Sequence, residues 1–118
     1  MTETMPQGPF RAYRLREDGD GGELTELSLD ELDSGEVTLR AEYSSVNYKD
    51  ALAGTGRGKI ARRLPLVGGI DVAGTVVASE SGRFAAGDAV LVTGCGLSED
   101  RDGGYAEYVR ARAEDVIA

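Results

Sequence analysis

Four consecutive polar residues, Asn47-Tyr48-Lys49-Asp50, form the part of the sequence best suited to chemistry. An Asn amide can donate an N–H to a ligand oxygen, but it can equally cap the first turn of a helix. Tyr48 could donate a proton or a hydrogen bond, although a phenol with a pKa of about 10 is a weak acid without help; a half-buried aromatic is the alternative. We expect Asp50 to orient a neighbour or anchor a loop rather than to act as an acid.

Positive charge gathers beside these residues. Residues 1–42 contain eleven acids and four bases, whereas residues 43–68 contain one acid and five bases. The bases are Lys49, Arg57, Lys59, Arg62 and Arg63. The net charge of −8 disfavours nucleic acid and anionic membranes as partners. A basic island inside an acidic chain indicates an anionic ligand near Asn47, with a solvated loop as the alternative.

The supply of metal ligands is small. The chain has no His and one Cys, Cys95, so it cannot assemble an ordinary zinc site. Carboxylates alone could hold Mg²⁺ or Ca²⁺, but no loop has the spacing of an EF-hand. We therefore expect a metal-free protein, with Cys95 as a small apolar filler. A single Cys, no apolar run of about 20 residues and no signal pattern favour a cytoplasmic location.

Many short strands are expected to position the polar residues. A length of 118 residues predicts one domain, which we place at 9–118 after a flexible N-terminus at 1–8. Seventeen glycines and no Trp favour turns and strands over long helices. Strands are expected at 10–15, 24–29, 36–43, 71–78, 88–93 and 105–111, and helical turns at 48–53. The sequence thus predicts a mainly β fold, a small barrel or sandwich with one or two short helices.

The segment before Asn47 shows the clearest alternation. Val37, Leu39, Ala41 and Tyr43 share one face of the expected strand, and polar residues take the other. Period two over eight residues is typical of a half-buried strand. If the strand runs on to Val46, Asn47 stands at its end and at the start of the helical turns.

These motifs resemble those of a known family. Four segments carry the resemblance: Ser44-Ser-Val-Asn-Tyr-Lys-Asp-Ala-Leu52, Gly69-Ile-Asp-Val-Ala-Gly-Thr-Val76, Phe84-Ala-Ala-Gly-Asp-Ala-Val90 and Gly103-Gly-Tyr-Ala-Glu107. The chain resembles the N-terminal, GroES-like catalytic domain of medium-chain dehydrogenase/reductases. Within them it is most similar to the zinc-free quinone-oxidoreductase branch, which includes bacterial acrylyl-CoA reductases. The first segment is the most specific, and the last two mark the superfamily in general.

Comparison with the zinc-dependent members of that superfamily supports a metal-free site. Those members have Cys at the position of Asn47 and His at the position of Ile70, so the resemblance excludes their zinc mechanism here. Two departures concern the branch itself, which usually has Pro at Gly68 and Trp at Asp102.

The resemblance implies a reductase. In the family, a hydride passes from NADPH to the β-carbon of a conjugated carbonyl, such as acrylyl-CoA, another enoyl-CoA or a quinone. The domain then only has to orient the substrate and stabilise the negative oxygen. By resemblance, Asn47, Tyr48 and Asp50 are the catalytic residues, and Tyr48, Lys49, Arg57 and Lys59 contact the cofactor. Solvated side chains are the alternative for Lys49 and the two bases after it.

The family's nucleotide-binding Rossmann domain would follow the last residues of this chain, and no Gly-x-Gly-x-x-Gly motif is present. We therefore expect a fragment that is inactive alone, with NADPH bound mainly by the missing domain and with a homodimer left open for the full-length enzyme. The alternative is a stand-alone GroES-like binding module without catalysis.

Overall fold

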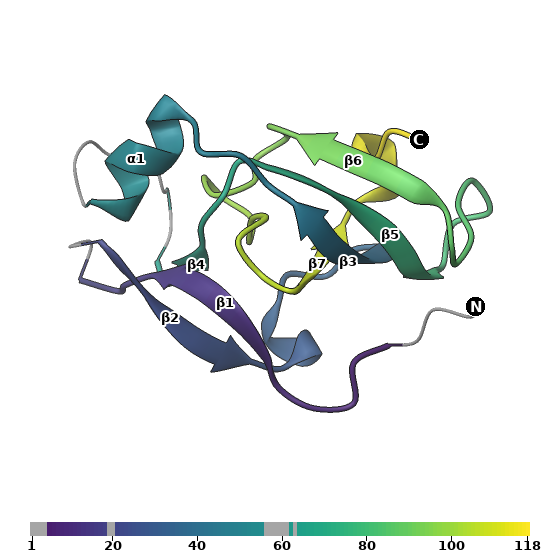
Figure 1. Ribbon diagram of the computed structural model, residues 1–118, viewed down its shortest axis with the longest axis horizontal. Helices are drawn as coiled ribbons and strands as arrows, with labels where there is room; N and C mark the ends of the chain where they lie inside the picture. Colours follow the sequence, from purple (N-terminus) through teal and green to yellow (C-terminus); the bar gives the residue numbers. More distant parts are fainter. Residues whose placement is uncertain (1–4, 19–20, 56–61, 63) are drawn as a thin grey trace.

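Two antiparallel sheets form the framework of the structure (Figure 1). The structure is a computed structural model that describes residues 5–18, 21–55, 62 and 64–118. Within the described residues there is a single α-helix, α1 (Tyr48–Gly54), which lies at one end of the molecule in the view of Figure 1. The strands are β1 (Phe10–Leu15), β2 (Gly22–Leu27), β3 (Val37–Tyr43), β4 (Leu66–Val67), β5 (Asp71–Ser79), β6 (Ala89–Thr93) and β7 (Tyr108–Ala111). Short 3₁₀ turns, η1 and η2, occupy Leu29–Glu31 and Ala113–Asp115.

The smaller sheet has the strand order β2-β1-β4. The β1–β2 hairpin is regular from Phe10, which pairs with Leu27, to Leu15, which pairs with Gly22. Phe10 and Leu27 are buried and form one apolar cluster with Val67 of β4. The strand predicted at 24–29 is therefore present as β2, and it begins and ends two residues earlier than expected.

The larger sheet has the order β6-β5-β3-β7 and carries the main core. Val37 and Leu39 of β3 are fully buried, as the alternation predicts. They pack with buried side chains of the neighbouring strands and loops: Val72, Val76, Phe84, Val90, Val92, Leu97 and Val109. The prediction of a mainly β, barrel-like fold is confirmed.

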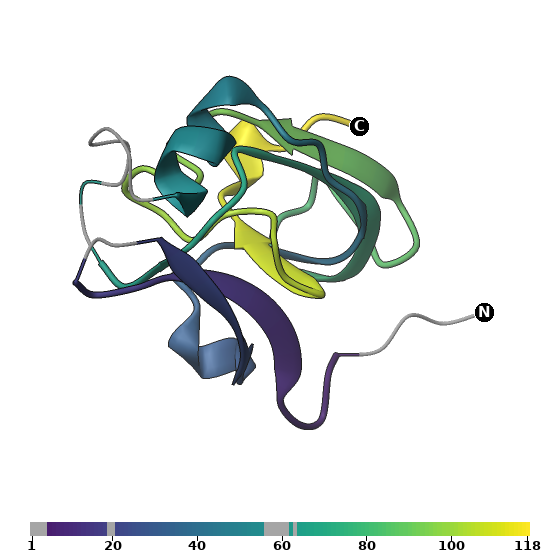
Figure 2. The same cartoon turned by 60° about the vertical axis from the view of Figure 1, so that its left-hand side comes forward.

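Residues 105–107 join the two sheets. Tyr13 of β1 donates its N–H to the carbonyl of Tyr105, and Glu107 donates to the carbonyl of Arg11. The carbonyl of Glu107 in turn accepts from Ala41 of β3. The predicted strand at 105–111 is therefore shorter, because its first residues bond to β1 before β7 enters the larger sheet. In Figure 2, β7 (yellow) is the strand of the larger sheet that lies toward β1.

Two expectations about individual side chains are wrong. Tyr43 was expected on the buried face of its strand but is 77% exposed. The β3–β5 register shifts between Ala41 and Tyr43, which ends the regular alternation there. Cys95 is exposed and has a positive φ of 56°, so it lies in a tight turn and fills no core. No helix in the described residues is long and apolar enough to cross a membrane.

Gly74 gives a test of the packing between β3 and β5. A Cβ at this position would lie 2.0 Å from the carbonyl oxygen of Arg40, whereas a Cβ at Gly82 would meet nothing within 4 Å. Because the obstacle is backbone, Gly74→Ala should lower the free energy of unfolding by about 2 kcal/mol. Gly82→Ala is the matched control and should stay within about 0.5 kcal/mol of the parent in urea denaturation. Equal stabilities of the two variants would contradict this packing.

Candidate active site

Asp50 anchors the start of α1. Its side chain is only 5% exposed, and its Oδ2 accepts the backbone N–H of Asn47 at 2.9 Å and the Asn47 side-chain amide at 3.0 Å. Its Oδ1 accepts the N–H of Ile70 at 3.0 Å. One carboxylate thus ties the N-cap of the helix to the turn that leads into β5. These bonds agree with the expectation that Asp50 anchors a loop, and its assignment as a catalytic residue remains a prediction.

Asp71, the first residue of β5, holds the connection between β3 and α1. Its Oδ1 accepts the backbone N–H of Ser45 at 2.9 Å, and its Oδ2 accepts the Ser45 hydroxyl and the Asn47 amide. Partial burial raises the pKa of Asp71, but the hydrogen bonds from Ser45, Asn47 and Ser44 outweigh it and leave the pKa below its ordinary value. Asp71 therefore remains ionised at neutral pH.

The Asn47 amide is committed to these two carboxylates. Its Nδ2 lies 3.0 Å from Asp50 Oδ2 and 3.1 Å from Asp71 Oδ2, and Ser45 Oγ is a third neighbour at 3.2 Å. Carboxylates only accept, so the amide must point its nitrogen toward them. Asn47 is the N-cap residue of α1, as one of the two sequence-based interpretations has it. Donation to a ligand would require one of these bonds to be exchanged.

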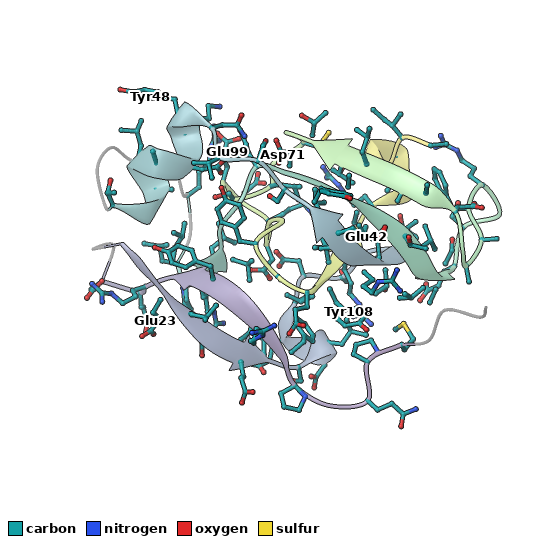
Figure 3. The ribbon with its side chains drawn as sticks, in the orientation of Figure 1. Glu23, Glu42, Tyr48, Asp71, Glu99 and Tyr108 are labelled. Atoms are coloured by element: carbon teal, nitrogen blue, oxygen red, sulfur yellow. The ribbon has the colours of Figure 1, made fainter. Side chains whose placement is uncertain are left out.

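Tyr48 is placed quite differently. It is 79% exposed, and its side chain extends away from the body of the structure at the first turn of α1 (Figure 3). Within the described part of the chain, its hydroxyl has no hydrogen-bond partner. Tyr48 is therefore available to a ligand, and it is not the half-buried aromatic of the alternative interpretation.

The structure describes two of the five basic residues near Asn47, namely Lys49 and Arg62. The Lys49 ammonium lies 3.5 Å from a carboxylate oxygen of Glu99, and the Lys49 side chain is 54% exposed. An exposed pair of this kind is weak, so Lys49 can exchange Glu99 for a ligand. Arg62 is exposed and donates its backbone N–H to the carbonyl of Glu99. Arg57, Lys59 and Arg63 lie outside the described residues.

Tyr105 is a member of the site that the sequence did not single out. Its hydroxyl donates to the carbonyl oxygen of Ser45 at 2.9 Å, and its ring lies edge-on to that of Tyr13 with 6.3 Å between centroids. Burial raises the pKa of Tyr105 to about 12, with the nearby carboxylates of Asp50 and Asp71 adding to the effect. The sequence offered one signal, the Gly103-Gly-Tyr-Ala-Glu107 motif, which marks the superfamily without giving Tyr105 a role.

Two hollows flank this cluster. One has a volume of about 390 Å³ and is lined by Tyr13, Val46, Asp50, Ala51, Gly54, Thr55 and Tyr105. The other, about 310 Å³, opens between Ser45, Asp71 and Leu91 on the outer side of β5 and β6. Both are of the size that small ligands occupy.

Among the described residues, no three His, Cys, Asp or Glu side chains are grouped to hold a metal ion, and the metal-free character remains a prediction.

At Asn47, hydrogen bonds join the chain that follows β3, the first turn of α1 and the first residue of β5. The model of the family described as "Alcohol dehydrogenase GroES-like domain" matches residues 33–118. The chain therefore belongs to this family of medium-chain dehydrogenase/reductases, and the resemblance read from the sequence is confirmed.

Three relatives are informative. The chain is 50% identical over 107 residues to AcuI of Escherichia coli (strain K12), provisionally named an acrylyl-CoA reductase, and the match covers 88% of this chain and 33% of AcuI. YhfP of Bacillus subtilis (strain 168), provisionally named a quinone oxidoreductase, is 44% identical over 77% of this chain and 28% of its own. The structure of the yhdH oxidoreductase from Salmonella enterica in complex with NADP has a TM-score of 0.87 at 46% identity and covers 92% of this chain and 34% of that one. The chain thus spans about a third of the length of these relatives.

The shared Asn47 amide predicts an unusual response to charge. Asp is ordinarily as good an N-cap as Asn. Here Asn47→Asp would place a third carboxylate against Asp50 and Asp71, where only a donor is accommodated. At neutral pH Asn47→Ala should lose about 1 kcal/mol of stability, and Asn47→Asp at least about 1 kcal/mol more. The difference in stability between Asn47→Asp and Asn47→Ala should narrow below pH ~4, where carboxylates take up protons. Thermal melts in which Asn47→Asp equals or exceeds Asn47→Ala in stability would contradict the hydrogen-bond arrangement.

The lowered pKa of Asp71 predicts that the stability of the protein depends on pH. Because its pKa is lowered by folding, its carboxylate contributes stability above the unfolded value of 3.8, and this contribution disappears as the pH falls through the folded value. Asp71→Asn should lower the free energy of unfolding by about 2 kcal/mol at neutral pH and by progressively less below 3.8. Asp88→Asn is the control, because the Asp88 carboxylate accepts one exposed backbone N–H, from Ala85. A pH-independent effect of Asp71→Asn would rule out the ionised acceptor.

Proposed function

We propose that this chain forms the substrate-binding part of an NADPH-dependent oxidoreductase that reduces a conjugated carbonyl, either acrylyl-CoA or another enoyl-CoA, or a quinone. The names of the relatives support these substrate classes, and the NADP bound to the Salmonella enterica enzyme supports the cofactor. NAD bound in the structure of YhfP, which has a TM-score of 0.88 to this chain, keeps the choice between the two nucleotides open to experiment.

The observation that carries the proposal is the contrast between Tyr48 and its neighbours. Asn47 and Asp50 are held by hydrogen bonds within the protein, whereas the adjacent Tyr48 hydroxyl is exposed and has no partner in the described part of the chain. A free donor on a fixed helix start is suited to bind a ligand with a defined orientation. This contrast supports a binding role for the first turn of α1.

The residues fit one flank of a nicotinamide cofactor. NADPH, when bound, supplies the hydride for the reduction. Tyr48 offers an aromatic face and a hydroxyl, and Lys49 offers an ammonium held only by an exposed ion pair. We assign Arg57 and Lys59 to the same flank, as the family resemblance implies. We expect the rest of the cofactor to be bound mainly outside this chain, as the family resemblance implies.

The substrate oxygen gains negative charge during the reduction and needs a hydrogen-bond donor. Tyr48 can donate without losing any bond. Asn47 can donate only by giving up Asp50 or Asp71, and both carboxylates would repel a negative oxygen. We therefore assign the donor role to Tyr48 first and to Asn47 second, with Asp50 as the group that orients Asn47 at the start of α1. A stand-alone binding module is less favoured, because the enzymes named above contain this domain as one third of their length.

A chimera tests the proposal. Residues 1–118 would be joined to the remaining two thirds of the E. coli relative, and NADPH oxidation measured with acrylyl-CoA and with a quinone. Tyr48→Phe should lower turnover by about 10²-fold, as loss of a transition-state donor does. Asn47→Ala should stay within about threefold of the parent and lower the melting temperature instead.

Tyr43→Phe is the matched control, because Tyr43 is equally exposed and lies outside α1. Turnover of Tyr48→Phe equal to that of Tyr43→Phe would remove Tyr48 from the reaction. A fall of about 10²–10³-fold in Asn47→Ala would make Asn47 the donor. A chimera that binds NADPH but reduces neither substrate would contradict the proposed reaction.

A further inference from the structure

The connection between β3 and α1 is held through Ser45. Ser45 uses its backbone N–H and its hydroxyl to bond Asp71, and its carbonyl oxygen accepts from Tyr105. The next residue, Val46, is 81% exposed, so apolar packing contributes little here. The path of the chain into α1 therefore depends on hydrogen bonds at one residue.

Tyr105 is itself fixed from several directions. Its backbone N–H donates to the carbonyl of Gly68, and its carbonyl accepts from Tyr13. Its ring lies against Gly69, where a Cβ would come within 2.8 Å of ring carbon Cδ1. The positive φ of 93° at Gly69 also favours glycine. The hydroxyl of Tyr105 thus has a position set by the smaller sheet and by the turn before β5.

The neighbouring tyrosine extends this arrangement to the other end of the helix. The Tyr13 hydroxyl donates to the carbonyl of Gly54, the last residue of α1, at 3.2 Å. Tyr13 and Tyr105 pack edge to face. One pair of aromatic side chains therefore contacts the chain just before α1 and at the end of α1.

We propose that Tyr105 is a positioning residue, whose hydrogen bond to Ser45 fixes the start of α1 and thereby the direction in which Tyr48 meets the cofactor. The part of this inference that concerns Tyr48 rests on the proposed function. With a pKa of about 12, the Tyr105 hydroxyl keeps its proton and remains a donor throughout the physiological range.

The first experiment uses the chain of 118 residues. Tyr105→Phe removes the hydroxyl and keeps the ring. Hydrogen exchange of the Ser45 and Asn47 amides should become about fivefold faster, which corresponds to the loss of one net hydrogen bond. Tyr108→Phe is the control, because Tyr108 is also a half-buried tyrosine and its ring packs on Phe10 at 5.5 Å, away from this connection. Unchanged exchange at both amides, or an equal increase across the core strands, would overturn the proposal.

The second experiment uses the chimera. Tyr105→Phe should raise the KM for NADPH about fivefold, since the contact of Tyr48 with the cofactor already exists in the ground state. It should also lower kcat, but by less than the roughly 10²-fold expected for Tyr48→Phe, because the Tyr48 hydroxyl remains and only its direction changes. Tyr108→Phe should change neither, at a similar melting temperature. Faster exchange with an unchanged KM would overturn the positioning role toward the cofactor. If the chimera reduces no substrate, the proposed function fails, and the exchange measurement still decides whether Tyr105 holds Ser45.

Discussion

The site depends on one buried carboxylate. Asp50 accepts three N–H groups, two from Asn47 and one from Ile70, at distances between 2.9 and 3.0 Å. A buried charge is tolerated only when such bonds replace its hydration. Its place in the first turn of α1 adds a favourable interaction with the helix dipole. Because these bonds reach both α1 and the turn before β5, the two segments hold each other in place.

A neutral amide between two carboxylates is the second constraint. Asp50 and Asp71 both bond the Asn47 nitrogen. A carboxylate at position 47 would bring three negative charges together. The arrangement explains why a residue with an obvious donor can be unavailable to a ligand. The neighbouring Tyr48 takes part in none of these bonds, and its hydroxyl is exposed and has no partner in the described part of the chain.

The sequence predicts the local features of the structure well. Alternation at Val37 and Leu39 predicts β3, and Asn47 and Gly54 predict the bounds of α1, because these signals lie within a few residues of the element they define. The roles of Asp71 and Tyr105 were not predictable in this way. They depend on the register of β5 against β3 and on the crossing of residues 105–107 between the sheets.

The same limit applies to side chains whose environment is set by an irregularity. Tyr43 follows the alternation of its strand, but a register shift turns it to solvent. Cys95 is of a residue type that is common in protein cores, but its backbone has the positive φ of a turn. The pattern of residue types carries no signal for either departure.

The bond between Tyr105 and Ser45 spans 60 positions of the sequence, and the bond between Asn47 and Asp71 spans 24. Closing loops of this length has an entropic cost that must be met before the contacts form. The complete site therefore has no counterpart in a partly folded chain, since Asn47 and Asp50 are local partners but Asp71 and Tyr105 are distant in the sequence. A chain emerging from the ribosome would complete this hydrogen-bond network only after β5 has formed and residues 105–107 have crossed between the sheets.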